Sequence, residues 1–83
     1  MDVKQIRYSL DLARPGSTWC IRELKGNRRF LSRVLGMGLT PGTRVGVLSN
    51  FKLGPLILFL RNSQVAIGRK EAEKIIVEQM EQL

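Results

Sequence analysis

The side chains that most often perform catalysis or bind metals are scarce in this sequence. Histidine is absent, there is one cysteine, Cys20, and only seven residues are acidic. Histidine is the commonest general base and the commonest metal ligand, so its absence removes most hydrolytic mechanisms. A zinc or iron site would then need paired thiolates or clustered carboxylates, and the spacing of these residues supplies neither. We therefore predict no catalytic residue, no metal site and no cofactor.

The remaining candidates for chemistry have simpler interpretations. Cys20 lies in an apolar, extended segment and has no histidine to activate its thiol, so we predict a small core residue rather than a nucleophile. The nearest acidic cluster, Glu71, Glu78 and Glu81, is interpreted as solvated acids that balance neighbouring lysines and arginines. The glycines of residues 36–42 do not match a phosphate-binding loop and are better explained by turns.

Charge and hydropathy indicate the environment and the kind of partner. Fourteen lysines and arginines against seven acids give a formal charge of +7, which attracts nucleic acid, acidic membranes or acidic protein surfaces. A single cysteine fits a reducing compartment. The longest apolar run, residues 55–60, is about a third of the length that spans a bilayer. We therefore expect a cytoplasmic protein without a secretion signal that does not itself cross a membrane.

A basic cluster at residues 28–33 is the strongest candidate for a nucleic-acid platform. Arg29 and Arg33 are predicted to share one face of a helix, with Arg28 nearby. The helix would present its apolar stripe to the core, and Phe30 belongs to that stripe, so the arginines would lack an aromatic stacking partner. The stripe consists of Phe30, Leu31, Val34 and Leu35. A small basic RNA- or DNA-binding barrel remains the alternative function.

The loop of residues 49–54 carries two large apolar side chains, Phe51 and Leu53, near a predicted hairpin tip. Exposed, they would suit a pocket on a partner protein. Folded back, they would cover the open end of a small barrel as a lid. The sequence leaves both possibilities open.

Turn residues and alternating hydrophobicity define the elements that must position these side chains. Strands are predicted over residues 18–24, 44–48, 55–61, 64–68 and 75–77, a helix from residue 28 to 35 or 37 with Asn27 as its N-cap, and a helical turn over 69–74. The uniformly apolar segment 55–61 is predicted to be a central strand covered on both faces, and residues 78–83 a polar tail. The fold class is therefore mainly β: a small SH3-like barrel of about five strands with a helical insertion. One domain spans residues 1–83, with its core at about 8–78.

Three stretches of the sequence together resemble the FeoA family. The first is LSRVLGMGLTPG (residues 31–42), in which residues 37–42 are the most diagnostic. It is followed by an extended segment, a Gly-Pro turn and the apolar strand LILFL (residues 56–60). The opening LDLARPGSTWCIREL and the closing RKEAEKIIV are also similar to that family. The resemblance implies an SH3-like barrel without enzymatic activity that works in the cytoplasm beside FeoB, the GTP-hydrolysing membrane transporter of ferrous iron.

The partner-binding residues follow from combining this resemblance with the surface candidates. We predict that Arg29 and Arg33, or the loop with Phe51, Lys52 and Leu53, dock on a FeoB-type transporter. The protein would have no substrate of its own, and nucleic acid would be its partner only under the alternative function. An oligomerising module is a third hypothesis, based on the apolar excess of residues 56–60.

Overall fold

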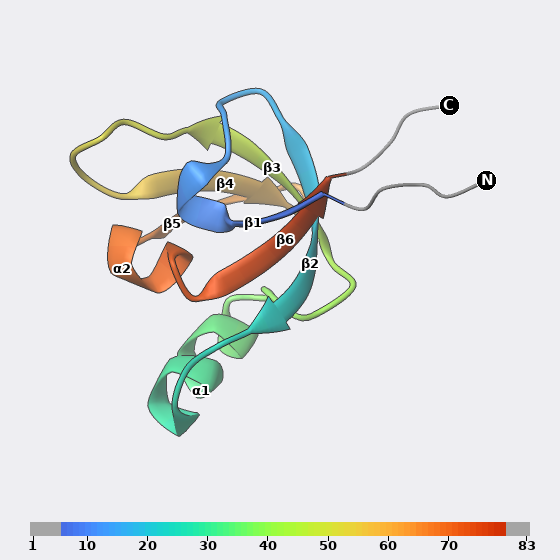
Figure 1. Cartoon of the computed structure of the whole chain (residues 1–83), viewed down its shortest axis with the longest axis vertical. Helices are drawn as coiled ribbons and strands as arrows, with labels where there is room; N and C mark the ends of the chain where they lie inside the picture. The colour runs from blue at the N-terminus through green and yellow to red at the C-terminus, as the bar shows by residue number, and fades with distance from the viewer. Residues whose placement is uncertain (1–5, 80–83) are drawn as a thin grey trace.

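The computed structural model describes residues 6–79, which fold around one antiparallel sheet (Figure 1). The six strands lie in the order β1-β6-β2-β3-β4-β5. Their bounds are β1 Arg7–Ser9, β2 Thr18–Leu24, β3 Arg44–Ser49, β4 Leu56–Leu60, β5 Ser63–Ile67 and β6 Ile75–Gln79. The helices are the short 3-10 helix η1 (Leu10–Leu12), α1 (Arg28–Gly36) and α2 (Arg69–Ala72). The predicted SH3-like, mainly β fold with a helical insertion is confirmed.

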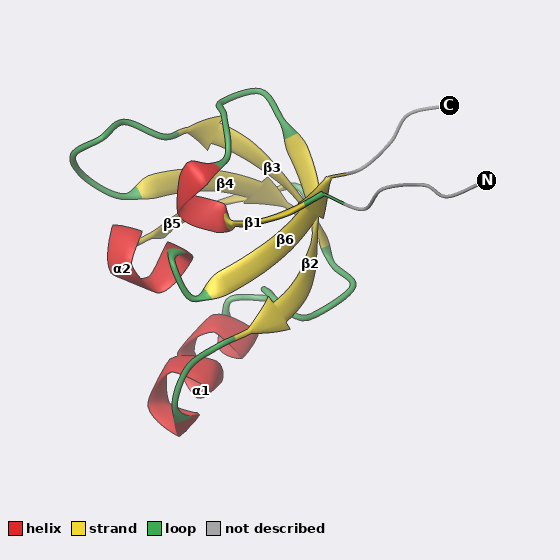
Figure 2. Cartoon of the chain, viewed as in Figure 1, coloured by secondary structure: helices red, strands yellow, loops and turns green. Residues whose placement is uncertain are grey.

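The sheet is curved, and its inner face encloses the core. In β2 the core side chains are Trp19 and Ile21, and in β3 they are Val45 and Val47, so each strand directs every second side chain into the core as a pleated strand must. Figure 2 shows η1 and α2 side by side at one end of the sheet, while α1 lies beyond the end of β2. The core is completed by Leu10, Ala13, Phe30, Val34, Leu39, Leu56, Leu58, Leu60, Ile67, Ala72, Ile75 and Val77.

Helix α1 begins and ends as the sequence predicts. The backbone N–H of Phe30 donates to Oδ1 of Asn27 at 2.9 Å, which satisfies one of the helix's first N–H groups. After the helix, Gly38 has a φ of +91°, a conformation that favours glycine. Phe30 and Val34, four residues apart, are buried, but Leu35 is 44% exposed. The predicted four-residue stripe is therefore too wide, because this helix buries only a narrow edge.

The prediction for residues 55–61 is wrong in two respects. β4 is next to the edge strand β5 rather than central, and Phe59 is 42% exposed while Leu58 and Leu60 are buried. The apolar run predicts burial on both faces because the sequence does not distinguish an outward-facing phenylalanine from one in the core. Phe59 faces Gly46 across the β3–β4 pair, and a Cβ placed on that glycine would lie 3.9 Å from the Cβ of Phe59.

The two ends of the chain also differ from expectation. β1 was not predicted, and it raises the strand number from about five to six. The last strand continues past the predicted residue 77 to Gln79, so Glu78 lies in a strand and is 6% exposed rather than part of a polar tail. Residues 80–83, the rest of that predicted tail, lie outside the described residues.

Candidate docking surfaces

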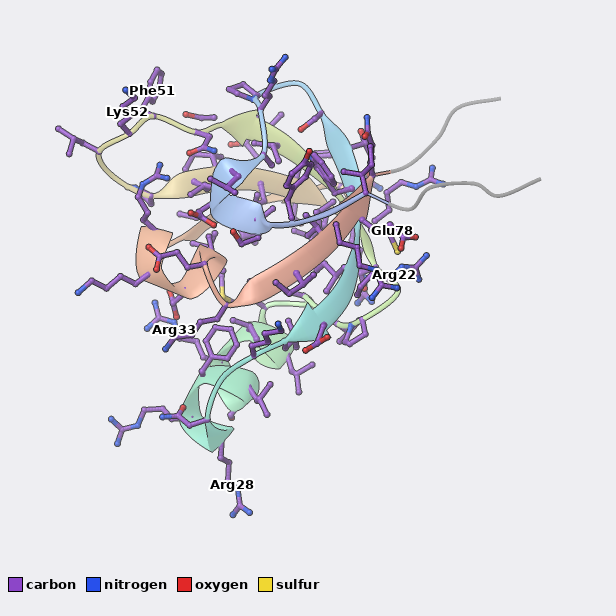
Figure 3. The ribbon with its side chains drawn as sticks, viewed as in Figure 1. Arg22, Arg28, Arg33, Phe51, Lys52 and Glu78 are labelled. Carbon is purple, nitrogen blue, oxygen red and sulfur yellow. The ribbon has the colours of Figure 1, made fainter. Side chains whose placement is uncertain are left out.

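The β3–β4 loop carries its two apolar side chains on the outside. Phe51 is 73% exposed and Leu53 89% exposed, and Lys52 between them is also exposed. Figure 3 shows Phe51 and Lys52 projecting from the loop away from the sheet. The lid hypothesis is therefore wrong, because neither side chain covers the core. Both remain accessible to a partner.

The base of this loop is fixed although its tip is exposed. The side-chain amide of Asn50 donates to the backbone oxygens of Asp11 and Ala13, at 2.9 and 2.6 Å. Nη2 of Arg69 donates to Oδ1 of Asn50 at 2.7 Å and to the backbone oxygen of Phe51. Residues of η1 and α2 thus hold the loop from both sides. A loop held in one conformation loses less entropy on binding than a mobile one.

The arginines of α1 form a second, separate surface. Arg29 is exposed, as predicted, but Nε of Arg33 lies 2.9 Å from Oε2 of Glu71 and so links α1 to the α2 helix. In Figure 3, Arg28 and Arg33 lie far from Phe51, so the structure does not bring the two predicted partner surfaces together. Phe30 is 6% exposed, as its place on the apolar stripe predicts, so it cannot stack on a base and the arginines have no aromatic partner there.

Glu78 is the centre of a charged cluster with Arg7 and Arg22 that was not predicted from the sequence. Its Oε1 accepts from Nε of Arg7 at 3.1 Å, and its Oε2 accepts from Nη2 and Nε of Arg22 at 2.9 and 3.2 Å. The hydrogen bonds from Arg22 lower the pKa of Glu78 against the opposing effect of desolvation, and Arg7 adds to the decrease. The pKa of Arg22 is raised, chiefly by the same hydrogen bonds.

This cluster spans three strands. Glu78 of β6 is paired in register with Arg7 of β1 and with Cys20 of β2. Cys20 is buried, as predicted, but it lies on the Glu78 side of β2, whereas Trp19 and Ile21 point into the main core. The interpretation of Glu78 as a solvated acid is wrong, while Glu71 is bound to Arg33 and Glu81 lies outside the described residues. Extending the predicted final strand by two residues would have included Glu78, but its position opposite Arg7 also depends on β1.

Two further observations concern metals and membranes. Within residues 6–79 the structure brings together no group of three or more cysteine, aspartate or glutamate side chains that could hold a metal ion. Nor does any helix in that range have the length and apolar character needed to cross a membrane.

Comparison with known proteins decides the family. The model of the FeoA domain matches residues 8–79, nearly all of the chain that the structure describes. The chain belongs to the FeoA family. Members of this family are small accessory proteins of Fe(2+) transport.

Individual FeoA proteins support this assignment. A relative from Methanocaldococcus jannaschii named Fe(2+) transport protein A is 32% identical over 74 residues, which cover 89% of each chain. The crystal structure of an iron uptake regulatory protein (FeoA) superimposes with a TM-score of 0.87 at 27% identity, covering 90% of this chain and 100% of that one.

The same fold also occurs within a larger protein. A manganese-dependent transcriptional repressor matches with a TM-score of 0.82 at 20% identity, over 94% of this chain and 44% of the repressor. At that identity the likeness concerns the fold alone.

Proposed function

We propose that this FeoA protein is a non-enzymatic regulator that docks on a FeoB-type membrane GTPase from the cytoplasmic side. The observation that carries the proposal is the β3–β4 loop: Phe51 and Leu53 are exposed at its tip while Asn50 fixes its base. Aromatic side chains such as that of Phe51 are enriched in the cores of protein interfaces, and Leu53 would add apolar contact area beside it. Lys52 lies between them and adds a positive charge that favours an acidic rim on the transporter.

Docking regulates transport only if the protein distinguishes two states of the transporter. A ligand shifts a conformational equilibrium by no more than the difference between its affinities for the two conformations. The rigid loop suits this task, since a preformed surface fits one shape of its partner better than another. Arg29 lies outside this surface and would contribute long-range attraction rather than a direct contact.

The test is a titration of labelled protein against the solubilised transporter at about 150 mM salt, an ionic strength that screens non-specific attraction. The double variant Phe51→Ala/Leu53→Ala should weaken binding by at least about tenfold, because two apolar anchors are lost. Leu35→Ala is the matched control, since Leu35 is an exposed leucine on α1. Duplex DNA and RNA serve as competitors.

Saturable binding that nucleic acid does not displace, and that the double variant alone weakens, is the expected result. If Leu35→Ala or Arg29→Glu weakens binding and the loop variant does not, the docking surface is α1 and the loop assignment is wrong. If only nucleic acid binds, the regulatory function itself is wrong.

A further inference from the structure

A shallow groove crosses the outer face of β2, β3 and β4, away from the core. Its volume is about 370 Å³ and its lining is Thr18, Arg44, Gly46, Phe59, Leu60, Arg61 and Asn62. Gly46 has no side chain to fill the groove, and the neighbouring Phe59 is 42% exposed. The groove therefore combines a flat apolar surface with two cationic walls.

Two arginines line the groove without a counter-ion. Arg44 begins β3, and Arg61 follows β4 in the turn to β5. Like charges that share one groove repel one another. Within residues 6–79, the ion pairs involve Arg7, Arg22, Lys25 and Arg33, and neither groove arginine has an acidic partner. An anion bound between them would remove this repulsion.

We propose that this groove binds a carboxylate-rich segment of a partner protein. A guanidinium group forms paired hydrogen bonds with a carboxylate, so Arg44 and Arg61 would each take one acidic side chain. An aliphatic residue between the two acids would pack on Phe59, with Thr18 and Asn62 offering hydrogen bonds at the rim. The groove provides only two cations, whereas binding to a nucleic-acid backbone usually neutralises several phosphates.

This site is separate from the docking loop. Arg44 begins β3 and Ser49 ends it, next to the loop, so the two sites lie roughly 17 Å apart along the strand at 3.3–3.4 Å per residue. The proposal therefore stands without the Phe51 loop. Loop variants should leave groove binding unchanged, and groove variants can be tested without the transporter.

The experiment is an NMR titration of the full, nitrogen-15-labelled chain with the acetylated peptide amide Glu-Glu-Leu-Glu-Glu. The matched control peptide is Gln-Gln-Leu-Gln-Gln, which has the same shape and no charge. We expect saturable shifts centred on the amides of Thr18, Gly46 and Asn62 with the acidic peptide only. Shifts centred elsewhere, or equal shifts with both peptides, would overturn the proposal.

The variant Arg44→Glu separates ligand binding from folding. It should weaken peptide binding by about tenfold or more, the loss expected when a charge-assisted contact is removed. It should also raise the midpoint of thermal unfolding, because it places an anion in the groove that Arg61 lines and removes a like charge from it. Arg28→Glu, the same charge change on α1, should do neither.

Two outcomes contradict the proposal at this stage. One is that Arg44→Glu and Arg28→Glu weaken peptide binding equally, which would indicate general electrostatic attraction rather than a specific site. The other is that oligothymidylate competes at the groove and binds it more tightly than the peptide, which would assign the groove to nucleic acid.

Discussion

Arg22 and Glu78 form a charged pair across the β2–β6 strands, with Nη2 of Arg22 2.9 Å from Oε2 of Glu78. Only 8% of the Glu78 side chain is exposed, while its partners Arg22 and Arg7 are 40% and 50% exposed. The carboxylate is thus the buried centre of a bridge from the edge strand β1 through β6 to β2. Its hydrogen bonds connect strands that are far apart in sequence.

We expect Glu78→Gln to lower the midpoint of thermal unfolding by several degrees. The amide keeps the shape of the side chain but removes the charge that both arginines share, and charge-assisted hydrogen bonds are stronger than neutral ones. Glu23→Gln is the control, because Glu23 is 54% exposed and its Oε2 lies 3.9 Å from Nζ of Lys25. Such exposed pairs contribute little. Equal midpoints for the two variants in a melt followed by circular dichroism would contradict this role.

The lowered pKa of Glu78 also predicts how stability depends on pH. The pKa is lower in the folded state than its ordinary value of 4.5, so the unfolded chain binds the proton more readily. The stabilisation from the ionised carboxylate is present above that ordinary value and is lost as the pH falls through the folded-state pKa. Urea unfolding from pH 7 downward should show the wild type losing its advantage over Glu78→Gln only in acid. A constant difference across this range would argue against the linkage.

Gly26 is the position at which the fold is least tolerant of an added methyl group. A Cβ at Gly26 would lie 2.1 Å from Cδ2 of Phe30, a ring that is only 6% exposed. Because that ring packs against the core, Gly26→Ala should destabilise the protein by about 1–3 kcal/mol, as overpacking does. Gly36→Ala is the matched control: nothing lies within 4 Å of its Cβ, and alanine is the better helix former. Urea unfolding of both variants measures the contrast, and equal stabilities would refute it.

The sequence predicted the local elements well because their signals are local. Two cases show this. Asn27 determines where the amphipathic helix α1 begins, and Arg61 and Asn62 determine the conformation of the turn that they form. Both residues of that turn have a positive φ, of 51° and 62°, which fits a two-residue hairpin.

Features that depend on strand pairing were less predictable. The position of β4 and the burial of Glu78 follow from which strands become neighbours, and a pattern of alternating residues does not contain that information. Likewise, Asn50 holds the base of the loop by a hydrogen bond to Asp11 of η1, a contact between residues far apart in sequence. The exposure of Phe51 at the tip of that loop could therefore not be predicted from the local sequence.

Asn50 connects the stability of the docking loop to its proposed function. Asn50→Ala removes the donors to the backbone oxygens of Asp11 and Ala13 and the acceptor of Arg69, so the loop should lose its fixed base while Phe51 and Leu53 remain in place in the sequence. The loss of these hydrogen bonds should cost about 1–3 kcal/mol of folding free energy, because partly buried polar groups are left unpaired.

The same variant should bind the transporter more weakly, since the loop must then be ordered at the moment of binding. Hydrogen exchange of the loop amides measures the loosening, and the titration against the solubilised transporter measures its consequence. Ser63→Ala is the control, because it also removes a polar side chain but lies at the β4–β5 turn, at the other end of β4. Faster loop exchange with unchanged affinity would show that the rigidity of the loop serves the fold and not the docking.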